Sequence, residues 1–295
     1  MSSSNTEKMP LATLTAMVVG GMVGAGVFSI PRNFAMATGV YGALIAWTIA
    51  GLGMLMLAFV FQTLANRKPD LDAGVYAYAR AGFGPYLGFA SAFGYWASAC
   101  VGNVSYWVLI KSTLGAVFPM FGDGNTISAV AVSSIGIWAF HFMVLRGTKE
   151  AAAINKIVTI AKVIPLLVFL VLVIFAFNPE VFAANLWGGA GASQDYLHAH
   201  GDLVAAGAAG AARDYGNLFE QVKATMLITV FVFLGIEGAS NYSRFAQKRE
   251  DVGTATVVGF LGVLALFASV SILSFGVLPR AATAHISSYS SGHPV

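Results

Sequence analysis

The chain has 295 residues, of which 57% are hydrophobic and only 10% are charged, whereas an average soluble domain has about 25% charged residues. This composition, with a mean hydropathy of +0.75, excludes a soluble globular protein and predicts an all-α, polytopic membrane protein. The net charge of +3 comes from 16 Lys and Arg residues that lie in short clusters between apolar segments, so nucleic acid is excluded as a partner.

A hydropathy window of about 19 residues predicts seven transmembrane helices, each long enough to cross about 30 Å of hydrocarbon. They lie near residues 12–36, 41–64, 86–117, 126–144, 153–177, 224–242 and 252–277. We therefore expect a transmembrane domain over residues 1–280 and a polar tail over residues 281–295. Between spans 5 and 6 we expect a loop over residues 178–223, with one short helix near residues 217–222.

Basic residues in short loops are retained on the cytoplasmic side of a membrane. Ten Lys and Arg residues lie before span 1 or in the loops that follow the even-numbered spans, and only five lie on the other side. The ten are Lys8, Arg67, Lys68, Arg80, Arg146, Lys149, Lys156, Arg244, Lys248 and Arg249. The distribution predicts a multi-pass protein of the cell inner (plasma) membrane with a cytoplasmic N-terminus and an extracytoplasmic loop 178–223.

Span 1 contains four glycines within seven residues, at Gly20, Gly21, Gly24 and Gly26. Each glycine costs about 1 kcal/mol of helix propensity relative to alanine. A packing surface of small residues would explain Gly20 and Gly24. A discontinuous helix also explains Gly26, which lies on another face, and is the better interpretation.

Span 6 is interrupted in a similar way, because Glu237 lies between the glycines of Gly235-Ile236-Glu237-Gly238. Glu237 is the one carboxylate in the seven predicted spans, and a charge at that depth is costly. A hydrogen-bonded structural acid is the alternative, but the position favours a functional role.

Interruptions in spans 1 and 6 are what a five-plus-five inverted repeat predicts, with spans 1–5 (residues 12–177) as the first repeat and residues 224–277 as the start of the second. Broken helices present free N–H groups to a carboxylate and free carbonyls to an ammonium group. A zwitterionic amino acid supplies both groups.

Three segments make a family resemblance specific. They are Gly24-Ala25-Gly26-Val27-Phe28 with Pro31, Gly74-Val75-Tyr76-Ala77-Tyr78-Ala79-Arg80 with Phe83-Gly84-Pro85, and Phe233-Leu234-Gly235-Ile236-Glu237-Gly238-Ala239-Ser240. Up to about Arg280 the chain resembles the amino acid–polyamine–organocation (APC) superfamily, whose fold is LeuT-like. Within it the chain is most similar to basic amino acid/polyamine antiporters, and among these to arginine/ornithine antiporters.

The resemblance implies a substrate-carboxylate site at the backbone of Gly24, Ala25 and Gly26, with Gly235 in the facing break. Arginine/agmatine exchangers have a serine at the position of Ala25 and a tryptophan at that of Phe231. The chain therefore lacks one hydroxyl contact, and its aromatic ring makes a weaker cation–π contact.

The resemblance also assigns roles to side chains on three other spans. It implies that Asn103 binds the substrate side chain and that Tyr95 gates the pocket. It implies that Glu237 acts in gating or proton linkage, and that Lys162 replaces the sodium ion of coupled relatives. Snorkelling of the Lys162 ammonium to the cytoplasmic surface is the alternative for that residue.

We expect a secondary-active transporter, not an enzyme, that exchanges arginine or lysine for an ornithine-like amine or amino acid by alternating access. A proton-coupled amino acid permease of another APC family and a non-transporting truncated fragment remain alternatives. A retinal pump would need a lysine in the last span, and a channel would need a filter motif. The single cysteine, Cys100, gives no sign of a metal centre, and no cofactor is expected.

The family has twelve spans, so the sequence also leads us to expect a truncated chain that is inactive alone and poorly stable in detergent. Its binding partners would be a small cationic amino acid and membrane lipid. Saturable exchange by the purified chain would contradict the expectation of inactivity and would require a homodimer.

Overall fold

The computed structural model describes residues 9–24, 26–68, 70–71, 74–115, 117–146, 148–188, 216–241, 246–280 and 283. Over these residues every regular element is a helix, apart from one isolated bridge between Met9 and Ala246. The helices are α1 (Leu11–Met22), α2 (Gly26–Ala37), α3 (Val40–Arg67), α4 (Gly74–Phe83), α5 (Pro85–Gly115), the 3₁₀ helix η1 (Pro119–Phe121), α6 (Ile127–Arg146), α7 (Thr148–Phe175), α8 (Pro179–Ala184), α10 (Leu218–Phe231), α11 (Gly238–Asn241) and α12 (Arg249–Ser274). The predicted all-α class is confirmed.

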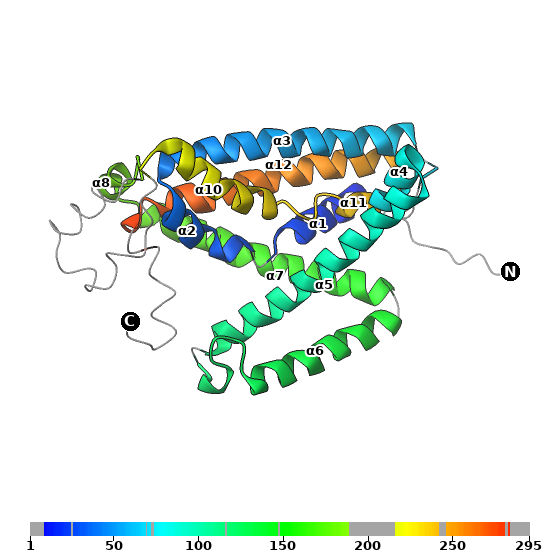
Figure 1. Cartoon of the computed structure of the whole chain (residues 1–295), viewed down its shortest axis with the longest axis horizontal. Helices are drawn as coiled ribbons and strands as arrows, with labels where there is room; N and C mark the ends of the chain where they lie inside the picture. The colour runs from blue at the N-terminus through cyan, green and yellow to red at the C-terminus, as the bar shows by residue number, and fades with distance from the viewer. Residues whose placement is uncertain are drawn as a thin grey trace.

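Two long helices, α3 and α12, run side by side in opposite directions along one face, and the segments α1, α2, α10 and α11 lie against them (Figure 1). A hydrogen bond joins the two long helices where Trp47 Nε1 donates to Ser271 Oγ over 2.7 Å, and both residues are buried. Burying the indole without a partner for its N–H would be costly, so this pair fixes the register of α3 against α12.

The centre of this bundle is an aromatic cluster. The fully buried Phe233 lies 5.6 Å from Trp47 and 5.1 Å from Phe260, measured between ring centroids. Phe34 stacks on Trp47, with 5.4 Å between the ring centroids. Burial of one such ring contributes about 1.5–3 kcal/mol, and Phe233 belongs to the irregular segment between α10 and α11. The cluster therefore holds that segment in place.

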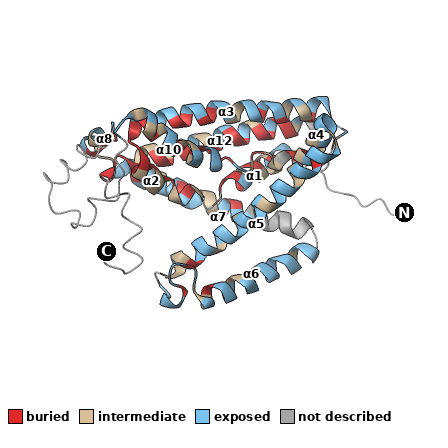
Figure 2. Ribbon diagram, in the orientation of Figure 1, coloured by how far each residue is buried: buried red, intermediate tan, exposed pale blue. Residues whose placement is uncertain are grey.

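Helices α5 and α6 diverge from the bundle and are almost entirely exposed (Figures 1 and 2). Along α5 only Gly88 and Lys111 are buried, and the Lys111 ammonium lies 5.2 Å from the ring centroids of both Trp107 and Phe121. The exposed side chains of both helices are mainly apolar, which suits contact with lipid.

Within the described part of the chain, four helical segments are long and apolar enough to span a membrane, and the bent pair α1 and α2 makes a fifth if it counts as one span. The four are Val40–Arg67, Ile127–Leu145, Ile157–Phe175 and Glu250–Ser274. The predicted third span is a continuous helix, α5, but its Ser, Asn and Tyr residues make it less apolar, and it is not among these. The predicted sixth span is divided between α10 and α11.

The predicted cytoplasmic loops share one end of the molecule. There the C-terminal end of α3, helix α4 and the start of α12 lie together (Figure 1). The chain near the N-terminus joins the same end, since Gln247 N donates to Met9 O over 2.9 Å. The arrangement agrees with the alternation of loops that the basic residues predict, while the side that faces the cytoplasm stays a prediction.

At the opposite end, the predicted loop differs in one respect. Helix α10 begins at Leu218, capped by the Asn217 side chain, which accepts from Glu220 N over 2.9 Å. The short helix expected near residues 217–222 is therefore the first turn of α10 rather than a separate element. A short helix not predicted from the sequence, α8, begins after Asn178. Residues 189–215 lie outside the described part of the chain.

At this end of the molecule, a buried polar network connects Arg280 with the end of α2 and with the segment after α8. Arg280 is only 1% exposed and donates to the carbonyl oxygens of Ala35 (2.7 Å), Met36 (3.2 Å) and Gly188. Asn185 accepts from Arg280 N over 2.9 Å. The last carbonyls of α2 have no partner within their own helix, so the guanidinium satisfies them and favours the negative end of the helix dipole.

Candidate functional site

The first helix break lies where the glycines of span 1 predict it. Helix α1 ends at Met22, α2 begins at Gly26, and their axes differ by 45°. Gly24 N donates to Met22 O over 2.8 Å, a tight turn that is not helical. Ala25 lies outside the described residues. A Cβ placed on Gly24 would lie 3.1 Å from the hydroxyl oxygen of Tyr106, so the missing side chain lets α5 approach the break.

The second break lies in span 6, as predicted. Helix α10 ends at Phe231, residues 232–237 form consecutive turns, and α11 begins at Gly238. Gly235 has a φ of +107°, a conformation that favours glycine. The sequence Gly235-Ile236-Glu237-Gly238 thus breaks the helix because its first glycine adopts this backbone conformation.

The two breaks touch through glycine backbones. A Cβ on Gly235 would lie 2.6 Å from the carbonyl carbon of Gly21 and 2.9 Å from Met22 N. On the other side, a Cβ on Gly26 would lie 3.3 Å from Val232 Cγ1. The predicted residues Gly24, Gly26 and Gly235 therefore lie in one region, although more than 200 residues separate the first from the last.

Glu237 belongs to the second break and stabilises it through a hydrogen bond from the backbone of that break. Its half-buried side chain accepts from Gly235 N through Oε2 over 3.1 Å. The Glu237 carbonyl accepts from Ser240 N (2.9 Å) and Ser240 Oγ (2.7 Å), which starts the next helix. The carboxylate is thus beside an irregular backbone rather than on a lipid-facing helix, and a hydrogen-bonded acid in this position stabilises the turn.

Lys162 reaches from α7 to the end of α1. Its ammonium nitrogen lies 3.4 Å from the carbonyl oxygen of Gly20, and the side chain is half-buried. Snorkelling would direct the ammonium to the membrane surface, whereas this contact directs it toward the glycine-rich segment. A fixed positive charge beside the C-terminal end of α1 is favourable because the helix dipole is negative there.

Both α5 candidates are exposed. Asn103 is exposed, and its Nδ2 donates to Ala99 O of its own helix over 3.0 Å. Tyr95 is 48% exposed. The α5 side chain that meets a break is Tyr106, which the sequence analysis missed. It lies three residues after Asn103 and so on the same helix face, a spacing that could have indicated it.

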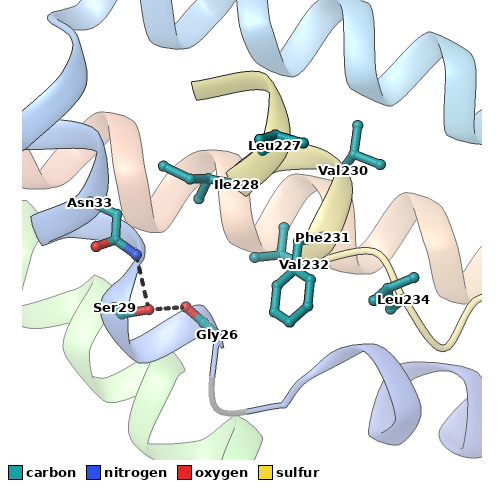
Figure 3. A pocket seen from close by; sticks show the side chains of 9 residues that line it. All are labelled: Gly26, Ser29, Asn33, Leu227, Ile228, Val230, Phe231, Val232 and Leu234. Atoms are coloured by element: carbon teal, nitrogen blue, oxygen red, sulfur yellow. Dashed lines mark hydrogen bonds between the residues drawn. The ribbon is translucent and has the colours of Figure 1, made fainter. Parts of the chain in front are cut away.

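A cavity of about 510 Å³ opens beside the breaks between α2 and α10 (Figure 3). Phe231, which is 63% exposed, and Gly26 both line it. The lining is polar only on α2, and it comprises Gly26, Ser29, Asn33, Leu227, Ile228, Val230, Phe231, Val232 and Leu234. Its volume and its largely apolar wall suit a small organic ligand.

Among the described residues, no group of three or more His, Cys, Asp or Glu side chains is placed to hold a metal ion. The arrangement instead offers backbone groups of two helix ends, an aromatic ring and one fixed cation. Such a site can bind a ligand with separate positive and negative groups.

Comparison with known proteins identifies the family of the chain. Residues 11–292 match the family model described as amino acid permease. The chain belongs to the amino acid permease family. The resemblance drawn from the glycine-rich segments is thereby confirmed, and a polytopic membrane fold with interrupted spans 1 and 6 agrees with it.

The chain is similar to several curated proteins, including the following three. The chain is 51% identical over 280 residues to the arginine/ornithine antiporter of Pseudomonas aeruginosa, which covers 95% of this chain and 54% of the relative. It is 45% identical to the L-lysine transport protein of Corynebacterium glutamicum, covering 95% and 52%. It is 39% identical to the arginine/agmatine antiporter of Chlamydia abortus, covering 94% and 54%. The chain spans about half the length of the curated relatives it matches.

Proposed function

We propose that this chain is the substrate-binding part of a secondary-active transporter that exchanges a basic amino acid for a related amine or amino acid. The observation that carries the proposal is the contact of two helix breaks, at Gly21 and Gly235, beside a cavity of about 510 Å³. The names of the relatives, which mention arginine, ornithine, lysine and agmatine, support the substrate class.

In the proposed site the substrate carboxylate is bound by backbone N–H groups at Gly24, Ala25 and Gly26, at the start of α2, and the Gly24 N–H exchanges its present acceptor, Met22 O, for the substrate. The first N–H groups of a helix have no partner in their own helix, and the positive end of the dipole attracts an anion. The substrate ammonium is bound by carbonyl oxygens freed at the ends of α1 and α10. Gly235 keeps the two backbones close enough for one small molecule to contact both.

The substrate side chain extends along the cavity past Phe231. An aromatic face attracts a cation by about 0.5–2 kcal/mol. Asn103 supplies a further polar contact once its helix moves closer, because α5 already touches Gly24 through Tyr106. Tyr95, on the same helix, closes the site.

Lys162 and Glu237 are proposed to control the backbone geometry of the two helix breaks. The Lys162 ammonium, beside the Gly20 carbonyl, takes the place of a coupling cation. The Glu237 carboxylate accepts a hydrogen bond from Gly235 N. Protonation of this carboxylate would therefore change the turn at Gly235. Because each side chain contacts one break directly, a change in either contact alters the geometry of the substrate site.

The protein is proposed to lie in the cell inner membrane with its N-terminus in the cytoplasm, as a monomer or homodimer, and to have no enzymatic role. Residues 12–177 would form the first structural repeat and residues 224–277 the start of the second. A proton-coupled permease is the second candidate function, and the observation that favours it is the position of Glu237 at a break.

Equilibrium binding tests the proposal. The purified 295-residue chain in lipid nanodiscs should bind radiolabelled L-arginine, and L-ornithine, L-lysine and agmatine should compete while L-leucine should not. Reconstitution of a longer carrier that contains this chain, with arginine on both sides of the vesicle membrane, then separates exchange from proton-coupled uptake, which depends on an imposed pH gradient. Equal competition by leucine would overturn the assignment to cationic substrates.

A further inference from the structure

A polar stripe on α2 lines the cavity and is not accounted for by the helix breaks. It consists of Gly26, Ser29 and Asn33, spaced so that they share one face of the helix. Asn33 Nδ2 donates to Ser29 Oγ over 3.3 Å, and Ser29 Oγ donates to Gly26 O over 2.9 Å (Figure 3). The stripe therefore leads from the first residue of α2 outward along the cavity.

The opposite wall gives these groups no partner. It consists of α10 and the turn after it, and its six lining side chains, between Leu227 and Leu234, are all apolar. Among the described residues no donor is recorded for the carboxamide oxygen of Asn33, and Ser29 Oγ keeps a further acceptor position. Acceptor positions that face a cavity can take hydrogen bonds from a bound molecule, so the stripe points to a ligand that donates hydrogen bonds.

None of the nine lining residues carries a charge. A cation in this cavity would therefore be bound by oxygen dipoles and the Phe231 ring rather than by a carboxylate. Releasing a cation from such a contact costs less free energy than separating a desolvated ion pair, which leaves a buried charge without its partner. Weak binding suits an exchanger, which must release one substrate before it binds the next.

We propose that Ser29 and Asn33 bind the far end of the substrate side chain and distinguish arginine from ornithine. The inference rests on the proposed function, in which the α-carboxylate is held at Gly24–Gly26. The helix rise of about 1.5 Å per residue places the Ser29 Cα about 4.5 Å and the Asn33 Cα about 10.5 Å beyond the Gly26 Cα, and the Asn33 carboxamide nitrogen lies 3.3 Å from Ser29 Oγ. The single ammonium of ornithine contacts Ser29, whereas the longer guanidinium of arginine, with its planar set of donors, contacts Ser29 and Asn33 together.

The experiment compares variants of the full 295-residue chain in nanodiscs by direct binding of L-arginine, L-ornithine and L-norvaline, which lacks the terminal cation. Asn33→Leu keeps a similar volume and removes the hydrogen-bonding group. We expect roughly tenfold weaker arginine binding, since a hydrogen bond to a charged group is lost. Ornithine should be less affected, and norvaline should bind as it does to the unsubstituted chain.

Ser29→Ala should weaken arginine and ornithine binding alike. The matched control is Ser134→Ala on α6, whose hydroxyl also donates to a backbone carbonyl of its own helix, Val130 O at 2.9 Å, but lies away from the cavity. Circular dichroism and gel filtration of each variant show whether it folds. Equal loss of arginine, ornithine and norvaline binding in a folded Asn33→Leu chain would overturn this inference alone. Absence of binding by the unsubstituted chain would overturn the proposed function with it.

Discussion

Replacing Gly235 with alanine adds one methyl group at the point where the two helix breaks touch. The new Cβ would lie 2.6 Å from the Gly21 carbonyl carbon and 2.7 Å from its oxygen, both backbone atoms of α1. Alanine would also have to adopt a φ of +107°. The backbone strain costs about 1–3 kcal/mol, and the displacement of α1 costs a further 1–3 kcal/mol or so, as overpacking does.

We therefore expect Gly235→Ala to lower the free energy of unfolding by about 2–6 kcal/mol, measured by titration with SDS and circular dichroism in mixed micelles. Gly21→Ala should be close to neutral, because its Cβ would meet Gly235 O at 3.2 Å but gains up to about 1 kcal/mol of helix propensity. Gly262→Ala is the matched control, since no heavy atom lies within 4 Å of its Cβ on α12. Equal unfolding free energies for Gly235→Ala and Gly262→Ala would refute the close contact of the breaks.

Substitutions at three further positions test other contacts. Lys162→Met removes the ammonium beside the Gly20 carbonyl, so arginine binding in nanodiscs should weaken at least about tenfold, the equivalent of one charged hydrogen bond. Glu237→Gln keeps an oxygen that can accept from Gly235 N, so the unfolding temperature should be unchanged, while arginine binding across a pH series should lose its pH dependence. Arg280→Met should lower the free energy of unfolding by at least about 3 kcal/mol because buried carbonyls lose a charged donor, and Arg280→Lys should not restore it because lysine lacks the planar fork.

Lys223→Met serves as a common control for the cationic positions. Among the described residues its exposed ammonium pairs with Glu220 of the same helix at 3.5 Å, and exposed pairs contribute little. If Lys162→Met or Arg280→Met behaves like this control, the corresponding buried contact has no energetic role. A Glu237→Gln chain that keeps both its binding and its pH dependence would exclude a protonation role for that residue.

Much of the fold follows from local sequence. The apolar segments predict the helices, and four glycines in span 1 predict where α1 ends and α2 begins. The local pattern fails where a helix continues into a predicted loop, as at Leu218, because the capping residue Asn217 decides the start and hydropathy does not register it. Helix α8 is too short for a hydropathy window to detect.

Some residues of the candidate site can likewise be predicted from the sequence, and others only from the structure. The glycine positions and the unusual acid Glu237 are visible in the sequence, because each violates the expected composition of a membrane helix. Tyr106, Ser29 and Asn33 are ordinary residues for such a helix, so their type gives no signal. Only their position against Gly24 or the cavity distinguishes them.

The sequence by itself determined that the chain crosses a membrane as helices, that two of them are broken, and that basic loops share one end. Backbone propensity and hydropathy depend on a few neighbouring residues, so short segments of sequence are enough to predict these properties. The tertiary structure decided that Gly21 meets Gly235, that Phe233 fills the centre of the bundle, and that Arg280 is buried against the end of α2. Each of these depends on packing between residues far apart in the chain, where shape and hydrogen-bond satisfaction, rather than local preference, select the partner.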